Sequence, residues 1–295
     1  MSEASAAAVA AWRDAGRMVE AAGHQVFVRD VPATADAGLD PLFVLHGFPS
    51  CSFDFRHVLD ALAADRRVVL FDFVGFGLSS KPDLRYSLRM QADVAEAVAA
   101  AVGLDRVALL THDMGDSVGG ELLARDLEGG LGFAVSERVL TNGSIYLDLA
   151  HLTVGQQLLL SLPDERFVIP DDPGDNFRAG LGQTFGPEHP ASADELDAQW
   201  ELLSHERGNT LMARTIRYIE DRRLEERRYT GAIEVHPSPL GVVWGEVDPV
   251  AVRAMTDRLR EARPDARLIT LGDVGHYPMV EAPTEFADAV RSLLS

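Results

Sequence analysis

One aspartate stands where a nucleophile elbow usually carries serine. Asp113 lies in the stretch Thr111-His112-Asp113-Met114-Gly115, after a short apolar run at 106–110 and before a helical stretch at 116–123. A strand, a sharp turn and a helix in this order are typical of such an elbow. A carboxylate attacks ester carbonyls poorly, but it can displace a leaving group from saturated carbon and become an alkyl ester. The pattern therefore predicts substitution at carbon by Asp113; a helix N-cap aspartate is the simpler alternative.

Two backbone N–H groups are candidates for stabilising the anion that forms when this ester is hydrolysed. Met114 would begin the helix after the elbow, where the helix dipole favours negative charge. Phe48 belongs to His46-Gly47-Phe48-Pro49, directly after an apolar run at 42–45. We predict that the N–H groups of Phe48 and Met114 form an oxyanion hole. His46 is interpreted as a residue that organises its loop rather than as a base.

A histidine and a carboxylate complete the predicted chemistry. His276 lies in Gly275-His276-Tyr277-Pro278, after the last predicted strand, and an imidazole can activate water near neutral pH. A carboxylate must orient that imidazole, and Asp248 is the predicted residue. Glu246 is its rival and is expected to be a solvated loop residue. The end of the preceding strand carries Asn142 and so offers no carboxylate.

The elements that must position these residues follow from hydrophobic patterning. Fully apolar runs alternate with amphipathic stretches, which predicts a mostly parallel, doubly wound sheet covered on both faces. Strands are expected at 42–45, 68–71, 106–110, from 139, at 240–244 and at 268–271, and an antiparallel hairpin at 17–21 and 25–29. Helices are expected at 53–64, 88–102, 116–123, 250–262 and 286–294. The candidate site residues then lie at the carboxyl ends of strands, where open α/β sheets place their sites.

One long segment interrupts this alternation. Between about 147 and 235 no buried strand is evident, while helical stretches occur near 152–161 and 194–225 and a Pro/Gly-rich joint spans Ile169 to Gly174. We predict a core formed by residues 1–146 and 236–295, with residues 147–235 inserted as a helical cap.

Composition excludes some classes of partner. The chain has 295 residues and a net charge of −19, which disfavours nucleic acid and anionic membranes as partners. The basic residues between Arg217 and Arg228 are interleaved with acidic ones, which indicates a salt-bridged helix face. Cys51 is the single cysteine, so no internal disulfide can form, and this fits a cytoplasmic protein. No apolar run is long enough to span a bilayer. No secretory signal, metal site or cofactor is expected, and the oligomeric state is left open.

Several of these motifs together resemble those of the α/β-hydrolase superfamily over nearly the whole chain. Within it, the chain is similar to the aspartate-nucleophile branch of epoxide hydrolases and haloalkane dehalogenases, and most of all to the mesoderm-specific transcript subgroup. The shared stretches are 46–49, 71–82, 112–116, 142–143 and 275–278. The order nucleophile, acid, histidine is also that of α/β-hydrolases. The resemblance implies an α/β-hydrolase fold with a cap and a small apolar substrate that has an electrophilic carbon.

The resemblance also separates the two activities of this branch. Haloalkane dehalogenases usually hold the halide with a tryptophan after the nucleophile and a polar residue in the first motif, but here Met114 and Phe48 occupy those positions. Epoxide hydrolases use two cap tyrosines to protonate the opened oxygen, and Tyr218 matches one of them. A second is not evident; Tyr146 and Tyr229 are candidates, and with His46 they are candidate substrate contacts.

The expected activity is therefore epoxide hydrolysis without a cofactor, with Asp113 as nucleophile, Tyr218 as acid, and water activated by the His276–Asp248 pair. Haloalkane dehalogenation is the first alternative. An esterase or lactonase using Ser117 or water, and a non-catalytic interaction protein on a hydrolase scaffold, are further alternatives.

Overall fold

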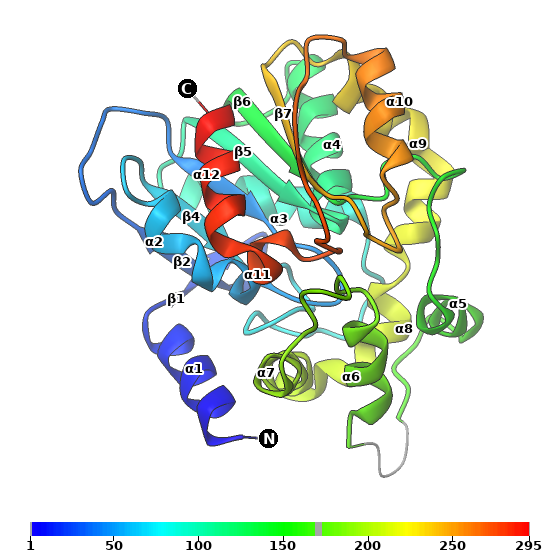
Figure 1. Ribbon diagram of the computed structural model, residues 1–295. Helices are drawn as coiled ribbons and strands as arrows, with labels where there is room; N and C mark the ends of the chain where they lie inside the picture. The colour runs from blue at the N-terminus through cyan, green and yellow to red at the C-terminus, as the bar shows by residue number, and fades with distance from the viewer. Residues whose placement is uncertain (1, 169–172, 295) are drawn as a thin grey trace.

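An eight-stranded sheet forms the centre of the molecule in the computed structural model, which describes residues 2–168 and 173–294 (Figure 1). The strand order is β1-β2-β4-β3-β5-β6-β7-β8. The β1–β2 hairpin pairs antiparallel to β4, and the remaining neighbours are parallel. The strands are β1 (Arg17–Ala21), β2 (His24–Val31), β3 (Leu42–Leu45), β4 (Val68–Phe71), β5 (Arg106–His112), β6 (Ala134–Thr141), β7 (Leu240–Gly245) and β8 (Arg267–Leu271). The predicted mostly parallel sheet is confirmed.

Helices cover both faces of this sheet, so the fold is doubly wound. Along β3, Phe43 and Leu45 enter one hydrophobic core while Leu42 and Val44 enter the other, as the two-residue period of a strand requires. The first core is closed by α3 (Leu88–Ala101), α4 (Met114–Leu127), α9 (Tyr218–Val235) and α10 (Ala254–Ala262). The second is closed by α1 (Glu3–Asp14), η1 (Ser52–His57), α2 (Leu59–Leu62) and α12 (Pro283–Leu293).

The segment between β6 and β7 is helical over its described residues. It contains α5 (Val154–Ser161), α6 (Asp175–Gly182), α7 (Ala193–Ser204), η2 (His205–Leu211), α8 (Met212–Thr215) and α9. Figure 1 shows α5 to α8 gathered beyond one end of the strands, whereas α9 continues beside α4. A Cβ on Gly120 of α4 would lie 2.7 Å from the Tyr229 carbonyl oxygen, so this part of α9 packs tightly on the core. The predicted boundary at residue 235 therefore falls at the end of α9, a helix that belongs to the inserted segment but packs on the core.

Three details differ from the expected elements. The helix expected across 194–225 is broken, because Glu206 and Arg207 adopt positive φ angles of 48° and 61°. The helix expected at 53–64 divides into η1 and α2, and α6 was not expected. Residues 169–172 of the expected Pro/Gly joint lie outside the described residues.

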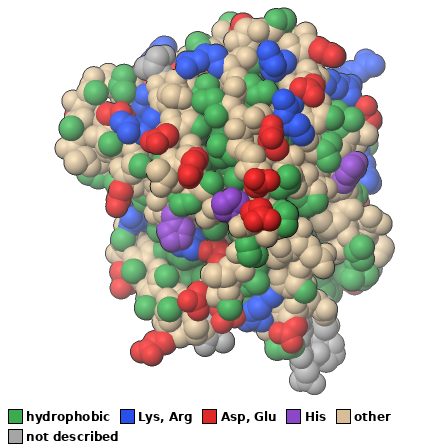
Figure 2. All heavy atoms as spheres, in the orientation of Figure 1, with side chains coloured by type: hydrophobic (Ala, Val, Ile, Leu, Met, Phe, Trp, Pro, Cys, Tyr) green, Lys and Arg blue, Asp and Glu red, His purple; other side chains and the backbone are tan. Residues whose placement is uncertain are grey.

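The surface mixes charges of both signs. On the face drawn in Figure 2, acidic and basic side chains are interspersed rather than gathered by sign. Among the described residues, no helix is both long and apolar enough to cross a bilayer.

Candidate active site

Asp113 occupies the sharp turn between β5 and α4 and has a φ angle of 49°. A positive φ is unfavourable for a residue with a side chain and persists only where the surroundings enforce it. Two glycines, Gly47 and Gly115, allow the neighbouring backbone to approach the Asp113 turn closely. A Cβ on Gly47 would lie 2.7 Å from the Asp113 Cβ, and a Cβ on Gly115 would lie 2.4 Å from the Leu45 carbonyl oxygen. The elbow and the loop after β3 are therefore pressed together.

This close approach brings a backbone donor to the Asp113 carboxylate, which is 2% exposed. The Phe48 N–H donates a hydrogen bond to Asp113 Oδ2 at 2.8 Å. Met114 is the first residue of α4, so its N–H has no acceptor inside the helix. Both predicted oxyanion donors thus flank the elbow, and one of them contacts the carboxylate.

His276 and Asp248 form a hydrogen-bonded pair beside Asp113. His276 Nδ1 lies 2.7 Å from Asp248 Oδ2, and His276 Nε2 lies 3.8 Å from Asp113 Oδ1. The second oxygen of Asp248 accepts hydrogen bonds from the N–H groups of Val250 (2.7 Å) and Ala251 (3.0 Å). The acid is therefore fixed by backbone, and the imidazole is fixed by the acid with Nε2 turned toward Asp113.

Asn142 has a role that the sequence did not reveal. Its side-chain N–H donates to Asp248 Oδ2 at 2.8 Å, and its oxygen accepts from the Gly245 N–H at 2.9 Å. Asn142 cannot replace the carboxylate, but it holds Asp248 in place from the neighbouring strand. Glu246 lies at the surface, 3.7 Å from Arg253, and is not part of the site.

The charges at the site control the protonation of His276. Burial lowers the pKa of His276, but the carboxylates of Asp248 and Asp113 outweigh it and raise this pKa to about 9. The imidazole is therefore cationic at neutral pH as long as Asp113 is ionised. Once the Asp113 charge is removed, this pKa falls, and a larger fraction of the imidazole is neutral and able to accept a proton.

The loop that carries His276 is held from two sides. His112 Nε2 lies 2.8 Å from the His276 carbonyl oxygen; since a carbonyl only accepts, this nitrogen carries the proton. Burial, together with the His276 charge, lowers the pKa of His112 to about 4, so the ring is neutral. The His276 N–H donates to the Thr184 carbonyl oxygen at 2.9 Å.

Glu281 joins the same loop to the segment between α6 and α7. Its carboxylate accepts hydrogen bonds from the backbone N–H groups of Gly275 (2.6 Å), Tyr277 (2.8 Å) and Gly186 (2.8 Å). Neither His112 nor Glu281 was predicted as a site residue. His112 belongs to the elbow motif, which was a usable signal, whereas nothing near Glu281 in the sequence indicates its three partners.

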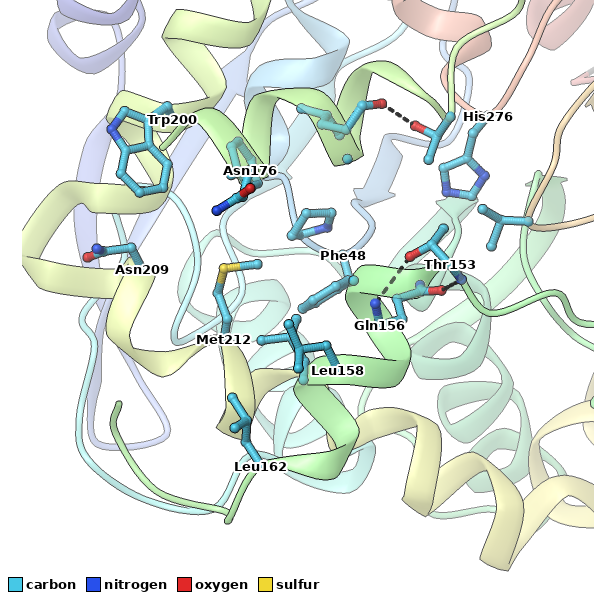
Figure 3. Close-up of a pocket in the computed structure, with 18 of the residues that line it drawn as sticks. Phe48, Thr153, Gln156, Leu158, Leu162, Asn176, Trp200, Asn209, Met212 and His276 are labelled. Carbon is cyan, nitrogen blue, oxygen red and sulfur yellow. Dashed lines mark hydrogen bonds between the residues drawn. The ribbon is translucent and has the colours of Figure 1, made fainter. Parts of the chain in front are cut away.

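A cavity of about 400 Å³ lies between the sheet and the helices of the predicted cap (Figure 3). Phe48 and His276 line it, and both approach Asp113: the Phe48 N–H donates to Asp113 Oδ2 at 2.8 Å, and His276 Nε2 lies 3.8 Å from Asp113 Oδ1. The cap side of the lining is mainly apolar: Leu158, Leu162, Phe167, Phe177, Trp200 and Met212. In Figure 3, His276 and Trp200 lie at opposite ends. Of the described residues that line the cavity, none is Asp, Glu, Lys or Arg. The cavity therefore suits an uncharged, largely apolar molecule.

The predicted tyrosines divide into one beside the site and two away from it. Tyr218, at the start of α9, is 3% exposed, and its ring lies 5.5 Å from that of Phe48. Burial and the Asp113 charge raise the pKa of Tyr218 well above its ordinary value. The Tyr146 hydroxyl donates instead to Glu234 at 2.8 Å, and Tyr229 packs on α4. None of the three lines the cavity, but Tyr218 packs on Phe48, which does, whereas the partners of Tyr146 and Tyr229 lie elsewhere; the structure therefore does not support these two as substrate contacts.

Tyr277 is a phenol that the sequence reasoning did not assign. It lines the cavity beside His276, and its ring stacks on Phe185 at 5.1 Å. Burial, Asp54 and Asp113 raise the pKa of Tyr277 well above the ordinary value. The signal was its place in the Gly-His-Tyr-Pro motif.

His46 is not a substrate contact in this structure. Its Nε2 accepts the Phe73 N–H at 2.9 Å, and its Nδ1 lies 2.8 Å from the Gly47 carbonyl oxygen. Burial lowers the pKa of His46 to about 3, so the ring is neutral. The interpretation of His46 as a loop-organising residue agrees with this geometry. Across residues 2–168 and 173–294, no group of three or more His, Cys, Asp or Glu side chains is arranged to hold a metal ion.

The sheet order, the elbow and the acid–histidine pair define the α/β-hydrolase architecture. A model of the alpha/beta hydrolase family matches residues 42–289. The chain belongs to the alpha/beta hydrolase family and is a hydrolase of that family.

Relatives of known sequence agree with this assignment. The chain is 45% identical to the protein described as "Putative hydrolase LipZ" of Mycobacterium tuberculosis, over 96% of each chain. It is 30% identical to the mesoderm-specific transcript homolog protein of Bos taurus, over 98% of this chain and 88% of that one. Among solved structures, haloalkane dehalogenase DbeA-M1 loop variant from Bradyrhizobium elkanii aligns over 95% of both chains with a TM-score of 0.72 and 19% identity. This last likeness concerns the fold alone.

Proposed function

We propose that the protein hydrolyses epoxides to diols through an alkyl ester of Asp113. The observation that carries the proposal is the position of an elbow aspartate against both the Phe48 N–H, at 2.8 Å, and His276 Nε2, at 3.8 Å. In this arrangement the carboxylate can attack a carbon, and the imidazole can later activate water against the resulting ester.

The first step opens the ring. A carboxylate oxygen of Asp113 forms a bond to a ring carbon while the carbon–oxygen bond breaks, and the ring oxygen takes a proton from Tyr218. Tyr277 is the tyrosine that lines the cavity among the described residues and is the candidate second donor, although its hydroxyl has Ser50 as a hydrogen-bond partner in the resting protein. Before the second step His276 gives up the proton that it carries in the resting enzyme, which returns the Tyr218 tyrosinate to a phenol directly or through solvent. The neutral imidazole then removes a proton from water, the hydroxide attacks the ester carbonyl, and the Phe48 and Met114 N–H groups stabilise the oxyanion. Over the cycle the proton from water replaces the one that the phenol gave.

Haloalkane dehalogenation remains the second candidate because it shares the first half-reaction. The side chains of Met114 and Phe48 offer no N–H donor to a halide, which disfavours it. A serine esterase is disfavoured more strongly. The hydroxyl of Ser117 accepts a hydrogen bond from Arg222 at 2.9 Å and has no histidine among its hydrogen-bond partners in the described part of the chain.

The charge of Asp113 leads to a prediction about pH. Esterification removes the negative charge that helps to raise the pKa of His276, so this pKa should be lower in the ester than in the free enzyme, where it is about 9. The rate of ester hydrolysis, followed in single turnovers, should therefore increase with pH and level off at a pH below 9. A midpoint equal to the free-enzyme value, measured by NMR of the His276 ring, would show that Asp113 does not become neutral during turnover.

Isotope labelling tests the proposal itself. In a single turnover in H₂¹⁸O with enzyme in excess, an ester mechanism transfers an unlabelled oxygen from Asp113 to the diol and leaves ¹⁸O in the Asp113 peptide. Direct attack by water would instead label the diol and leave the peptide unlabelled. Epoxides, bromoalkanes and carboxylic esters of matched length should be compared in this assay. Turnover of bromoalkanes but not of epoxides would replace the proposed activity with dehalogenation.

A further inference from the structure

Arg222 is a buried cation directly beside Tyr218. It belongs to the basic stretch interpreted from the sequence as a salt-bridged helix face, but it is 3% exposed. Its Nε donates to the Ser117 hydroxyl at 2.9 Å, and its guanidinium carbon lies 5.0 Å from the centre of the Tyr218 ring. Arg222 follows Tyr218 by four residues on α9, so one helical turn brings the two side chains to the same face.

The charge of Arg222 is only partly compensated. Its Nη2 is buried without a hydrogen-bond partner among the described residues. Asp116 is the nearby acid, 1% exposed, with Oδ1 accepting from the Thr111 hydroxyl and Oδ2 lacking a partner in the described part of the chain. Burial, and after it the Asp113 charge, raise the pKa of Asp116 well above its ordinary value, which disfavours the ionised form of this acid. A buried guanidinium with one nitrogen lacking a described hydrogen-bond partner therefore lies over the Tyr218 ring.

Such a cation favours loss of the phenol proton. A positive charge in a buried environment stabilises a nearby anion more strongly than it would in water. In the resting enzyme the Asp113 charge opposes this effect on Tyr218. As Asp113 forms its ester, that charge disappears while the charge of Arg222 remains. The phenol therefore becomes more acidic at the moment when the ring oxygen needs a proton.

We propose that Arg222 is a positioning residue that acts through Tyr218, stabilising the tyrosinate left when this phenol protonates the opened epoxide oxygen. In that step the Asp113–carbon bond forms, the ring carbon–oxygen bond breaks, and the Tyr218 proton moves to the ring oxygen. The water consumed in the second step resupplies the proton. This inference rests on the proposed epoxide activity and adds the source of the acidity of Tyr218.

The leaving group distinguishes this role from a purely structural one. We would measure the rate of alkyl-enzyme formation with an epoxide and with a bromoalkane of matched length, in Arg222→Met, Arg222→Lys and the parent chain. A bromide leaves without a proton, so only epoxide opening should slow in Arg222→Met, on the order of 10-fold or more, with partial recovery in Arg222→Lys. Arg223→Met, an exposed neighbour, is the control and should match the parent. Equal slowing with both reagents would overturn the proposal.

A second measurement does not depend on turnover. Fluorinated tyrosine, whose phenol is more acidic, can be incorporated and the Tyr218 signal assigned with Tyr218→Phe. By ¹⁹F NMR the Tyr218 phenol should titrate at higher pH in Arg222→Met than in the parent, and an unchanged titration would contradict the role of Arg222. Failure of all epoxides to alkylate the parent chain, with the titration shift present, would instead locate the error in the proposed activity.

Discussion

Replacing His276 with glutamine should stop the reaction at the alkyl ester. Glutamine can still donate to Asp248 but cannot take a proton from water, so alkylation of Asp113 proceeds and hydrolysis does not. General-base catalysis contributes about 10²–10⁴ in rate, and turnover should fall by at least this factor. Intact-mass spectrometry should show the enzyme heavier by one epoxide, and peptide mapping should place the adduct on Asp113.

The control for this trap is the double substitution Asp113→Asn with His276→Gln, which should gain no mass. An adduct that persists in the double variant would place the alkylated residue elsewhere. If neither an epoxide nor a bromoalkane leaves an adduct on the His276→Gln enzyme, Asp113 is not the nucleophile.

Replacing Asp113 with asparagine should abolish turnover. Removing the nucleophile of subtilisin costs about 10⁶ in kcat, and an effect on this order is expected, since no carboxylate among the described residues that line the cavity could replace Asp113. Steady-state kinetics with the best substrate from the epoxide panel would measure it, with mass spectrometry to exclude deamidation back to aspartate.

Asp116→Asn is the matched control for Asp113→Asn. Asp116 lies three residues away and is equally buried, and burial raises its pKa well above the ordinary value, so an uncharged amide of the same size is a mild replacement. This variant should retain activity within about 10-fold, since no nucleophile or base is lost. Similar losses in the two variants would indicate damage to the elbow rather than loss of a nucleophile.

Local patterns predicted most of the sheet, and they singled out three residues that the structure brings together. The strands are short apolar runs bounded by loops, and Asp113, Asp248 and His276 each follow such a run directly, so their convergence at one edge follows from parallel topology. The elbow pattern of strand, turn and helix likewise predicted that the N–H groups of Phe48 and Met114 would lie near Asp113.

Residues whose roles depend on distant partners could not be predicted in this way. Glu281 joins three N–H groups from two parts of the chain, and Asn142 matters only because Asp248 lies on the neighbouring strand. Tyr146 was considered a substrate contact because of its place near the cap, but Glu234, 88 residues later, takes its hydroxyl. The alternating charges from 217 to 228 did not predict that the Arg222 side chain is buried. Such a pattern indicates an exposed helix as a whole and does not distinguish one arginine from another.

The bonds from Thr184 and Gly186 to the histidine loop bear on how a substrate enters and leaves. If the helices between β6 and β7 swung away as a hinged lid, these hydrogen bonds would break and the loop that carries His276 would lose its anchor. We therefore expect substrate and product to pass beside α5, where Leu158 lines the cavity and is also 60% exposed to solvent. Small movements of α5 would then control product release, while Asp113, Asp248 and His276 keep their positions relative to one another.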